Sequence, residues 1–374
     1  MIQEPLRDWI NQLGKEFGLG VVSCMSALFV VGVLQIFNPY SPGLLRGILG
    51  LKLMFMPWLI IPLAYAYFDN AQVLGRFFKI LVIFSIPINI FGLTQYVKGP
   101  TFMVATFGPG FNSNTMQAMV YGYHATFVRI IGTFASSAHY SHYLIFNVII
   151  CLALFLSGSK PRWLWVAIIL QNFFCQLCTG SRGALLELGV MFIFFLAVMK
   201  RARSVMTAFL LFGGGLYLAF ANLGPIVAKR FETVTEIKGV RKRTVDMAPK
   251  MFADLLAKYP LGKGMGAASQ ASRHLGKIQG EFSLIESYTS KLQLEMGVAG
   301  VILFYLMVVM FILQWRRWVR AFYQEDDAYL FFMALSAYAI GCLVAGAFPE
   351  TPPTSVFLWA SLGILPRIAA FESG

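Results

Sequence analysis

Ten apolar runs, each roughly 20 residues long, constrain the fold of this chain more than any other feature. A helix of about 20 apolar residues is long enough to cross the roughly 30 Å hydrocarbon core of a bilayer. Of the 374 residues, 58% are hydrophobic and 13% are charged, a balance that soluble domains do not have. The runs are 19–37, 51–68, 77–97, 136–156, 162–178, 183–199, 204–223, 292–314, 328–348 and 354–370. The sequence therefore predicts a polytopic membrane protein.

The predicted fold class is an all-α transmembrane bundle of about ten helices, forming one integral membrane domain over residues 1–374. Helices are required because lipid offers backbone amides no hydrogen-bond partner, and the runs lack the alternating pattern of a barrel strand. The count is open to nine or eleven, since run 162–178 is short and Arg46 with Lys52 blurs the start of the second run. Residues 1–18 are expected to be a retained amphipathic lead-in, because no small-residue cleavage site follows a short apolar core.

Basic residues fall on alternate connections between the runs, and this pattern predicts the orientation. The short connections on one side carry Arg7, Lys15, Arg76, Lys79, Lys160, Arg162, the clusters 200–203 and 315–320, and Arg367. The short connections on the other side are nearly free of Lys and Arg, so both chain ends are predicted to be cytoplasmic. Two long segments, 98–135 and 224–291, are then predicted on the outer face, because long loops cross a membrane largely regardless of charge.

Cysteine and histidine spacing gives no sign of a metal site. The five cysteines lie in or beside apolar runs without metal-type spacing and are expected to be small core residues. His139 and His142 lie three residues apart and share a helix face, where packing or a sugar contact is favoured over a metal. Residues 258–266 are glycine-rich but lack the strand and the Ser or Thr of a nucleotide loop. We therefore expect no cofactor, and expect these glycines to allow a tight return of the outer segment to the membrane.

The outer segments are rich in cations. Residues 70–186 contain no Asp or Glu, so Lys98, Arg129 and Arg182 have no local carboxylate to neutralise them. Segment 224–291 contains twelve Lys or Arg against six Asp or Glu, and its densest patch includes Arg241 and Arg243. Most lysines in this segment are expected to be solvated. The pattern as a whole predicts a cationic basin above the membrane, suited to an anion that is attached to a lipid.

Arg182 stands apart from the other cations because it opens an apolar run directly after the turn Thr179-Gly180-Ser181. A cation at or below the membrane interface is costly and usually has a function. The alternatives are contact with lipid phosphate or pairing with Glu187. Residues five apart do not share a helix face as residues three or four apart do, which weakens the second alternative. A functional role for Arg182 is therefore favoured.

Several short motifs, in order along the chain, resemble the superfamily of O-antigen ligases and O-antigen polymerases (Wzy-type). The motifs are Asn38-Pro39, Gly50-Leu51-Lys52, Arg129-Ile-Ile-Gly-Thr-Phe with 141–144 after it, Thr-Gly-Ser-Arg-Gly at 179–183, Tyr-Pro-Leu-Gly-Lys-Gly-Met-Gly at 259–266, Glu286-Ser-Tyr, and Glu-Met-Gly-Val-Ala-Gly at 295–300. No single motif is specific, but the ordered set covers residues 38 to 300. The chain has fewer apolar runs than is common in that superfamily, which leaves the correspondence of its first helices open.

The resemblance implies a GT-C-like fold with a long helical periplasmic loop, in the bacterial inner membrane. It also implies an inverting, metal-independent transfer of a glycan from undecaprenyl diphosphate to a hydroxyl group on the periplasmic face. Arginine suits such a leaving group because its fork binds two phosphate oxygens and keeps its charge. By resemblance, diphosphate binding is expected of Arg129, Arg182 and one of Arg241 and Arg243, with Arg243 at the better spacing. Lys52 is expected to help steer the phosphates.

The resemblance also predicts the base that takes the proton of the acceptor hydroxyl. Glu286 stands where the ligases have a histidine, which favours a polymerase, and His274 is the fallback. The expected partners are an undecaprenyl-diphosphate-linked oligosaccharide, the growing glycan acceptor and the bilayer, but no nucleic acid; participation of a chain-length regulator is left open. The alternatives are a ligase that transfers glycan to lipid A core and, from a different class, a transporter of the lipid-linked glycan. Internal repeats, which are typical of transporters, are not evident.

Overall fold

Helices are the only regular secondary structure in the part of the chain described by the computed structural model, which covers residues 14–68, 70–99, 102, 105–106, 129–199, 202–222, 248–268, 287–320, 322, 327–345 and 351–373. Its elements are α2 (Leu19–Ile36), α3 (Leu44–Phe55), the 3₁₀ helix η1 (Met56–Leu59), α4 (Ile60–Tyr67), α5 (Ala71–Lys98), α8 (Ser137–Leu156), α9 (Arg162–Cys178), α10 (Arg182–Val198), α11 (Ala202–Asn222), α14 (Ala248–Lys258), α16 (Tyr288–Val319), α17 (Asp327–Ala345) and α18 (Thr354–Ser373). Each of the ten predicted runs falls on a helix. The all-α prediction is thus confirmed for the described residues.

Six helical stretches are long and apolar enough to cross a membrane by length and composition alone. They are Leu19–Ile36, Leu44–Tyr67, Ala71–Lys98, Ser137–Leu156, Tyr288–Val319 and Asp327–Val344. These stretches indicate an integral membrane protein. The other predicted runs are shorter as helices: α9 and α10 have 17 residues each, and the apolar parts of α11 and α18 are Val205–Ala219 and Thr354–Ala370. The six stretches fall short of the ten predicted crossings.

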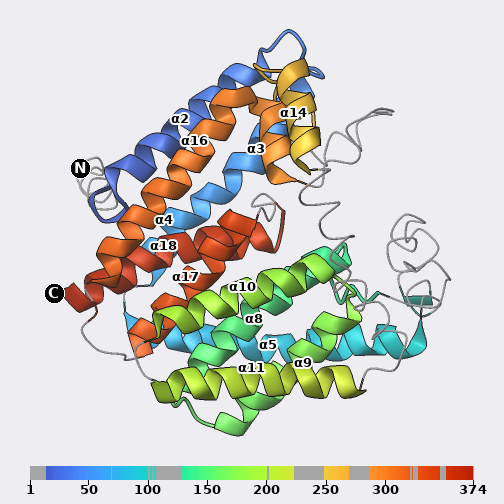
Figure 1. Cartoon of the computed structure of the whole chain (residues 1–374), viewed down its shortest axis with the longest axis vertical. Helices are drawn as coiled ribbons and strands as arrows, with labels where there is room; N and C mark the ends of the chain where they lie inside the picture. Colours follow the sequence, from blue (N-terminus) through green and yellow to red (C-terminus); the bar gives the residue numbers. More distant parts are fainter. Residues whose placement is uncertain are drawn as a thin grey trace.

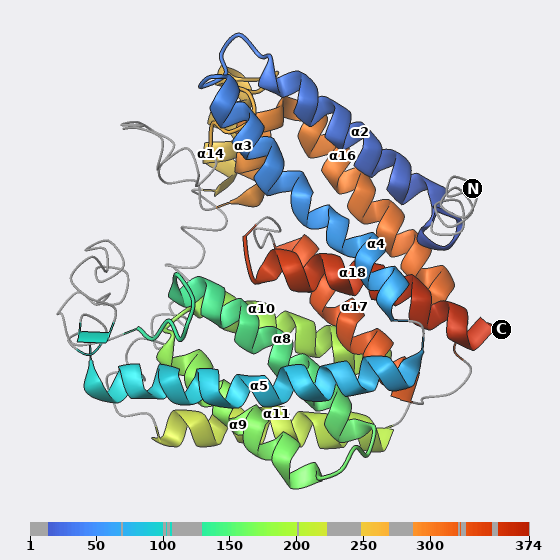
Figure 2. The same cartoon turned by 180° about the vertical axis from the view of Figure 1, so that it is seen from behind.

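The helices form two groups joined by α17 and α18 (Figure 1). One group contains α2, α3, α4, α14 and α16, in which α16 packs along α2; the other contains α5, α8, α9, α10 and α11. α18 packs against α4, while α17 packs against α8 and α10, so this pair connects the two groups. Seen from behind, the α2–α3 and α9–α10 turns lie toward one end of the bundle and the C-terminus lies at the other (Figure 2). We call the end formed by residues 37–43 and 179–181 the mouth.

At the end opposite the mouth, the last residues of the predicted lead-in are held by polar contacts. Tyr65 donates a hydrogen bond to the Glu16 carboxylate at 2.7 Å, and the Arg367 guanidinium lies 5.4 Å from the Tyr65 ring. The Glu16 backbone carbonyl accepts hydrogen bonds from the side chains of Gln314 and Trp318, each at 3.1 Å. These contacts join α4, α16 and α18 around one acidic residue, so the two ends of the described chain lie at the same end of the bundle.

Candidate functional site

The α9–α10 turn is fixed at the mouth by Thr179, whose side chain is fully buried. The Thr179 hydroxyl lies 2.9 Å from the Ser141 hydroxyl of α8 and donates to the Gln176 carbonyl at 2.7 Å. The same oxygen accepts from the Ser181 amide at 3.2 Å, and Gly180 completes the turn with a φ of 62°, which favours glycine. A single buried hydroxyl therefore connects the end of α9, the turn and α8.

Arg129 binds to this turn. Its Nε donates to the Thr179 carbonyl at 2.7 Å, and the neighbouring Ile130 amide donates to the Cys178 carbonyl at 3.3 Å. Both carbonyls belong to the C-terminal end of α9, where the helix dipole favours a cation. Arg129 is thus brought to the turn from which α10 begins with Arg182. Two predicted arginines, far apart in sequence, therefore belong to the same turn region of the mouth.

The segment that carries Arg129 is held from beneath by the buried amide of Gln95 on α5. The Gln95 Oε1 atom accepts from the backbone amides of Ile131 and Gly132, both at 3.0 Å, and its Nε2 donates to the Gly132 carbonyl at 2.6 Å. Gly132 has a φ of 57°, and a Cβ atom there would lie 3.1 Å from the Tyr140 ring. The Arg129 backbone therefore follows a fixed path that a larger residue at 132 would disturb.

Arg182 is the first residue of α10, at an open helix N-terminus. The N-cap residue, Ser181, makes no side-chain hydrogen bond to the first turn of the helix. The first amides of a helix have no partner within it and, together with the helix dipole, favour an anion. A Cβ atom at Gly183 would meet nothing within 4 Å, so the space beside the first turn is open. The geometry combines an arginine with the first turn of a helix that its N-cap side chain does not bond, which is suited to phosphate oxygens.

The glycine-rich segment after α14 is pressed against other backbone at the mouth. Gly262, Gly264 and Gly266 have φ values of 82°, 100° and 84°, and a Cβ atom at Gly266 would lie 2.2 Å from the Arg46 carbonyl. A Cβ atom at Gly262 would lie 2.7 Å from the amide of Gly297 in α16. The predicted tight backbone path of these glycines is confirmed, while the assignment of the segment to the outer face stays a prediction.

The same segment is bonded at the point where α16 is interrupted. Gly297 has a φ of 69° and a ψ of −167°, outside the helical range. The amide that follows it, of Val298, donates to the Pro260 carbonyl at 3.0 Å, and the Lys263 amide donates to the Leu294 carbonyl at 2.6 Å. Backbone groups released by the break thus find partners in the glycine-rich segment, as buried amides and carbonyls require.

A buried ion pair lies just before this break. Lys291 and Glu295 are 3% and 2% exposed, and their charged atoms lie 3.7 Å apart, one helical turn from each other. Glu295 also accepts from the Ala268 amide at 3.0 Å, which ties the end of the glycine-rich segment to α16. Since Glu295 is bonded to the Ala268 backbone and paired with Lys291, this pair serves to position the segment.

The remaining predicted site residues are not joined to this turn by the described contacts. Lys52 is exposed in the last turn of α3, in the other helix group, and no contact among the described residues links it to Arg129 or Arg182. Glu286, Arg241, Arg243 and His274 lie outside the described residues.

The buried carboxylate of Glu187 is a functional candidate that the sequence motifs alone do not indicate. The sequence offers it as a partner of Arg182, whereas its Oε2 atom lies 3.4 Å from Nδ1 of His142 on α8. Glu187 is 7% exposed, and Tyr338 and Cys342 of α17 lie beside it as electrostatic neighbours. The sequence signal was present, because Glu187 is the first acid after residue 69. No group of three or more potential metal ligands occurs in the part of the chain that the structure describes.

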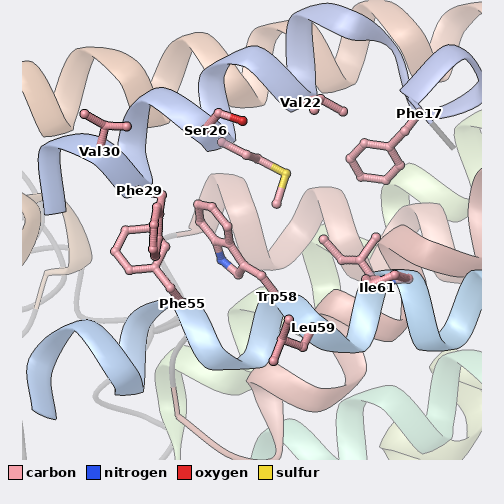
Figure 3. A pocket seen from close by; sticks show the side chains of 11 residues that line it. Phe17, Val22, Ser26, Phe29, Val30, Phe55, Trp58, Leu59 and Ile61 are labelled. Atoms are coloured by element: carbon pink, nitrogen blue, oxygen red, sulfur yellow. The ribbon is translucent and has the colours of Figure 1, made fainter. Parts of the chain in front are cut away.

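A cavity of about 460 Å³ lies away from these groups, between α2 and the bend formed by η1 and α4 (Figure 3). Pro57 lies in η1, where the span from Leu44 to Tyr67 changes from α to 3₁₀ geometry. The lining residues are Phe17, Val22, Met25, Ser26, Phe29, Val30, Phe55, Trp58, Leu59, Ile61 and Pro62. The lining contains no ionisable side chain, so this cavity is suited to binding apolar chains and offers no group for acid–base catalysis.

Comparison with protein-family models gives no match for this chain. Comparison with curated proteins gives no match either.

Proposed function

We propose that this protein is a metal-independent, inverting glycosyltransferase that joins undecaprenyl-diphosphate-linked oligosaccharides into an O-antigen or exopolysaccharide chain. The observation that supports it is that Arg129 is bonded to the Thr179 carbonyl in the turn from which α10 begins with Arg182. Both arginines come from a stretch of chain, residues 70–186, without a single acid. A cationic site with helix amides, at the end of membrane-crossing helices, fits a diphosphate that is attached to a lipid.

The chemistry requires such a site because the leaving group gains negative charge as the sugar–oxygen bond breaks. Fixed cations in a poorly hydrated place stabilise the transition state more than the ground state, which is what raises the rate. The Nε contact of Arg129 with the Thr179 carbonyl holds that guanidinium in a fixed direction. A pre-positioned guanidinium loses less freedom on binding, so its full interaction is available in the transition state.

Further residues are expected to contribute to the site, most of which lie outside the described residues. Arg243, or Arg241 in its place, is expected to join the diphosphate site, with Lys52 steering the phosphates from α3. Glu286 is the base that the resemblance predicts for the acceptor hydroxyl. In this proposal all ten apolar runs cross the bacterial inner membrane in a GT-C-like arrangement. Both chain ends are cytoplasmic, and the mouth opens to the periplasm.

A transporter of the lipid-linked glycan is the second candidate, and the break in α16 at Gly297 is the observation that favours it. Interrupted helices bind substrates or ions near the membrane midplane in many transporters. Here the backbone groups at the break are bonded to the glycine-rich segment instead, through Val298 and Lys263. The break therefore has a structural explanation, and the glycosyltransferase remains the better supported function. A ligase acting on lipid A core shares the diphosphate chemistry and differs only in the acceptor.

The test is a defined reaction with purified protein in liposomes. Synthetic undecaprenyl diphosphate bearing one oligosaccharide repeat is expected to be lengthened without added metal or nucleotide, as read by mass spectrometry of the products. Transfer to added lipid A core, with no lengthening, would assign the protein as a ligase. Movement of the lipid-linked glycan across the bilayer without any new glycosidic bond would assign it as a transporter.

A further inference from the structure

Two ionisable side chains meet in the core of the second helix group, below the mouth. His142 is on the second turn of α8 and Glu187 on the second turn of α10, with 3.4 Å between Nδ1 and Oε2. At about 1.5 Å of rise per residue, Glu187 lies some 7–8 Å below Arg182 along α10. The pair therefore lies between one and two helical turns below Arg182 along α10, with Glu187 on a different face of that helix.

The surroundings of the pair come from every helix packed on it. On α8, His139 lies one turn closer to the mouth, and on α10 Arg182 is the nearest charged residue toward the mouth. From α17, the Tyr338 hydroxyl and the Cys342 thiol lie beside Glu187. α17 approaches α10 closely because Gly341 lies against Met191.

The pair is only partly satisfied by its surroundings, which is unusual for buried polar groups. Within the described ranges, His142 Nδ1 and Glu187 Oε1 are buried without a hydrogen bond of good geometry, while the Cys342 thiol interacts with both Glu187 and the Tyr338 hydroxyl. The His142 side chain nevertheless keeps 17% of its surface exposed. Since Nδ1 is buried, this exposure belongs to the other atoms of the side chain. One ring nitrogen thus lies beside a carboxylate while part of the side chain stays exposed.

We propose that His142 is the proton acceptor for the acceptor hydroxyl, with Glu187 orienting its ring and stabilising the imidazolium. This inference rests on the proposed glycosyltransferase function and competes with Glu286 for the same role. An imidazole that gives one N–H to a carboxylate presents its other nitrogen as the base. The 3.4 Å contact is longer than a working hydrogen bond, as is common before substrate binds.

The proposed step balances in atoms and charge. The acceptor oxygen forms a bond to the anomeric carbon while its O–H bond breaks, and the proton passes to His142. The bond between the anomeric carbon and the diphosphate oxygen breaks, and its electron pair leaves with the diphosphate toward Arg182 and Arg129. The imidazolium then lies beside the Glu187 carboxylate and later releases its proton to water. No metal or second reactant is needed.

The experiment compares His142→Gln, Glu187→Gln, the double variant and Glu286→Gln in the lengthening reaction. A general base contributes about 10²- to 10⁴-fold to the rate, so His142→Gln is expected to lower turnover at least 100-fold. Glu187→Gln is expected to lower turnover less, and the double variant no further than His142→Gln, because the two residues act as a unit. Binding of undecaprenyl diphosphate, the product used as a probe, is expected to stay within about twofold, which a loss of structure would not allow.

Asn172→Ala is the matched control for burial. Asn172 accepts a hydrogen bond from Asn89 at 3.2 Å in the same helix group. Its loss is expected to reduce stability but not turnover per folded molecule. If His142→Gln does not fold, Glu187→Gln, which keeps the shape of the side chain, decides alone.

The outcomes separate this inference from the function on which it rests. Unchanged turnover in His142→Gln or Glu187→Gln, with loss in Glu286→Gln, would overturn the inference and leave the glycosyltransferase intact. Parallel losses of probe binding and turnover would overturn it too, because they indicate a structural pair. Wild-type protein that lengthens nothing would remove the function itself, and the inference with it.

Discussion

Replacing Arg182 with alanine separates a catalytic cation from a structural one. Arg182 is half-buried at the first residue of α10, where the positive end of the helix dipole disfavours a cation. The interaction of Arg182 with the helix dipole is therefore unfavourable for folding. When a diphosphate is bound, its negative charge is attracted both to the guanidinium and to the helix N-terminus.

The size of the effect follows from the contacts that would be lost. An arginine fork makes two hydrogen bonds to phosphate oxygens, each contributing about 1.5 kcal/mol or more when charged. A loss of about 3 kcal/mol in the transition state corresponds to a fall of about 150-fold in kcat/KM. The free energy of unfolding is expected to change by less than about 1 kcal/mol, since the side chain is only half-buried and its charge opposes the dipole.

The assay measures lengthening of undecaprenyl-diphosphate oligosaccharide together with thermal unfolding in the same liposomes. Arg162→Ala is the matched control, because Arg162 is the first residue of α9, exposed, at the opposite end of that helix. The 17 residues of α9 separate it from the site by about 25 Å. Loss of stability in Arg182→Ala with unchanged kcat/KM, or equal losses of activity in both variants, would refute the reasoning.

Three further outcomes are expected from the same structure. Arg129→Lys loses the Nε contact that fixes the guanidinium, so turnover is expected to fall about 10-fold in the lengthening assay while folding is kept. Gly262→Ala forces a left-handed backbone onto alanine against α16 and is expected to cost about 2 kcal/mol in thermal unfolding. Gly189→Ala in open space on α10 is its control and is not expected to destabilise the protein. Lys291→Met leaves the buried Glu295 carboxylate without its cation, and the free energy of unfolding measured by denaturation is expected to fall by about 3 kcal/mol. Adding Glu295→Leu to this variant is expected to restore part of that loss.

Much of the architecture could be predicted because lipid restricts the chain to helices of a set length. The ten apolar runs coincide with helices for this reason, and breakers such as the glycines of 262–266 were correctly expected at a tight return. The number of crossings is less certain from sequence because α9 and α10, at 17 residues each, are close to the minimum length. Hydropathy alone does not measure where such a helix begins and ends.

The sequence indicates the arginines near the α9–α10 turn, but it does not indicate contacts between side chains of different helices. Arg129 and Arg182 were singled out because no acid accompanies them, and the structure adds the Thr179 carbonyl that brings them to one turn. The contact between His142 and Glu187 depends on how α8 and α10 are rotated about their axes. Spacing within one helix carries no information on that rotation. For this reason the sequence suggests partners for Glu187 on α10 but not on α8.

The two buried side-chain pairs differ in how completely their polar atoms are bonded. Lys291 and Glu295 are almost fully buried, and Glu295 accepts from the Ala268 amide, so the pair stabilises the glycine-rich segment at the break in α16. His142 and Glu187 keep unpartnered atoms and a partly exposed side chain. Leaving buried polar atoms without partners costs stability, and such a cost is commonly kept at functional sites. Of the two pairs, the second keeps more side-chain surface exposed, 17% at His142 against 4% at Lys291.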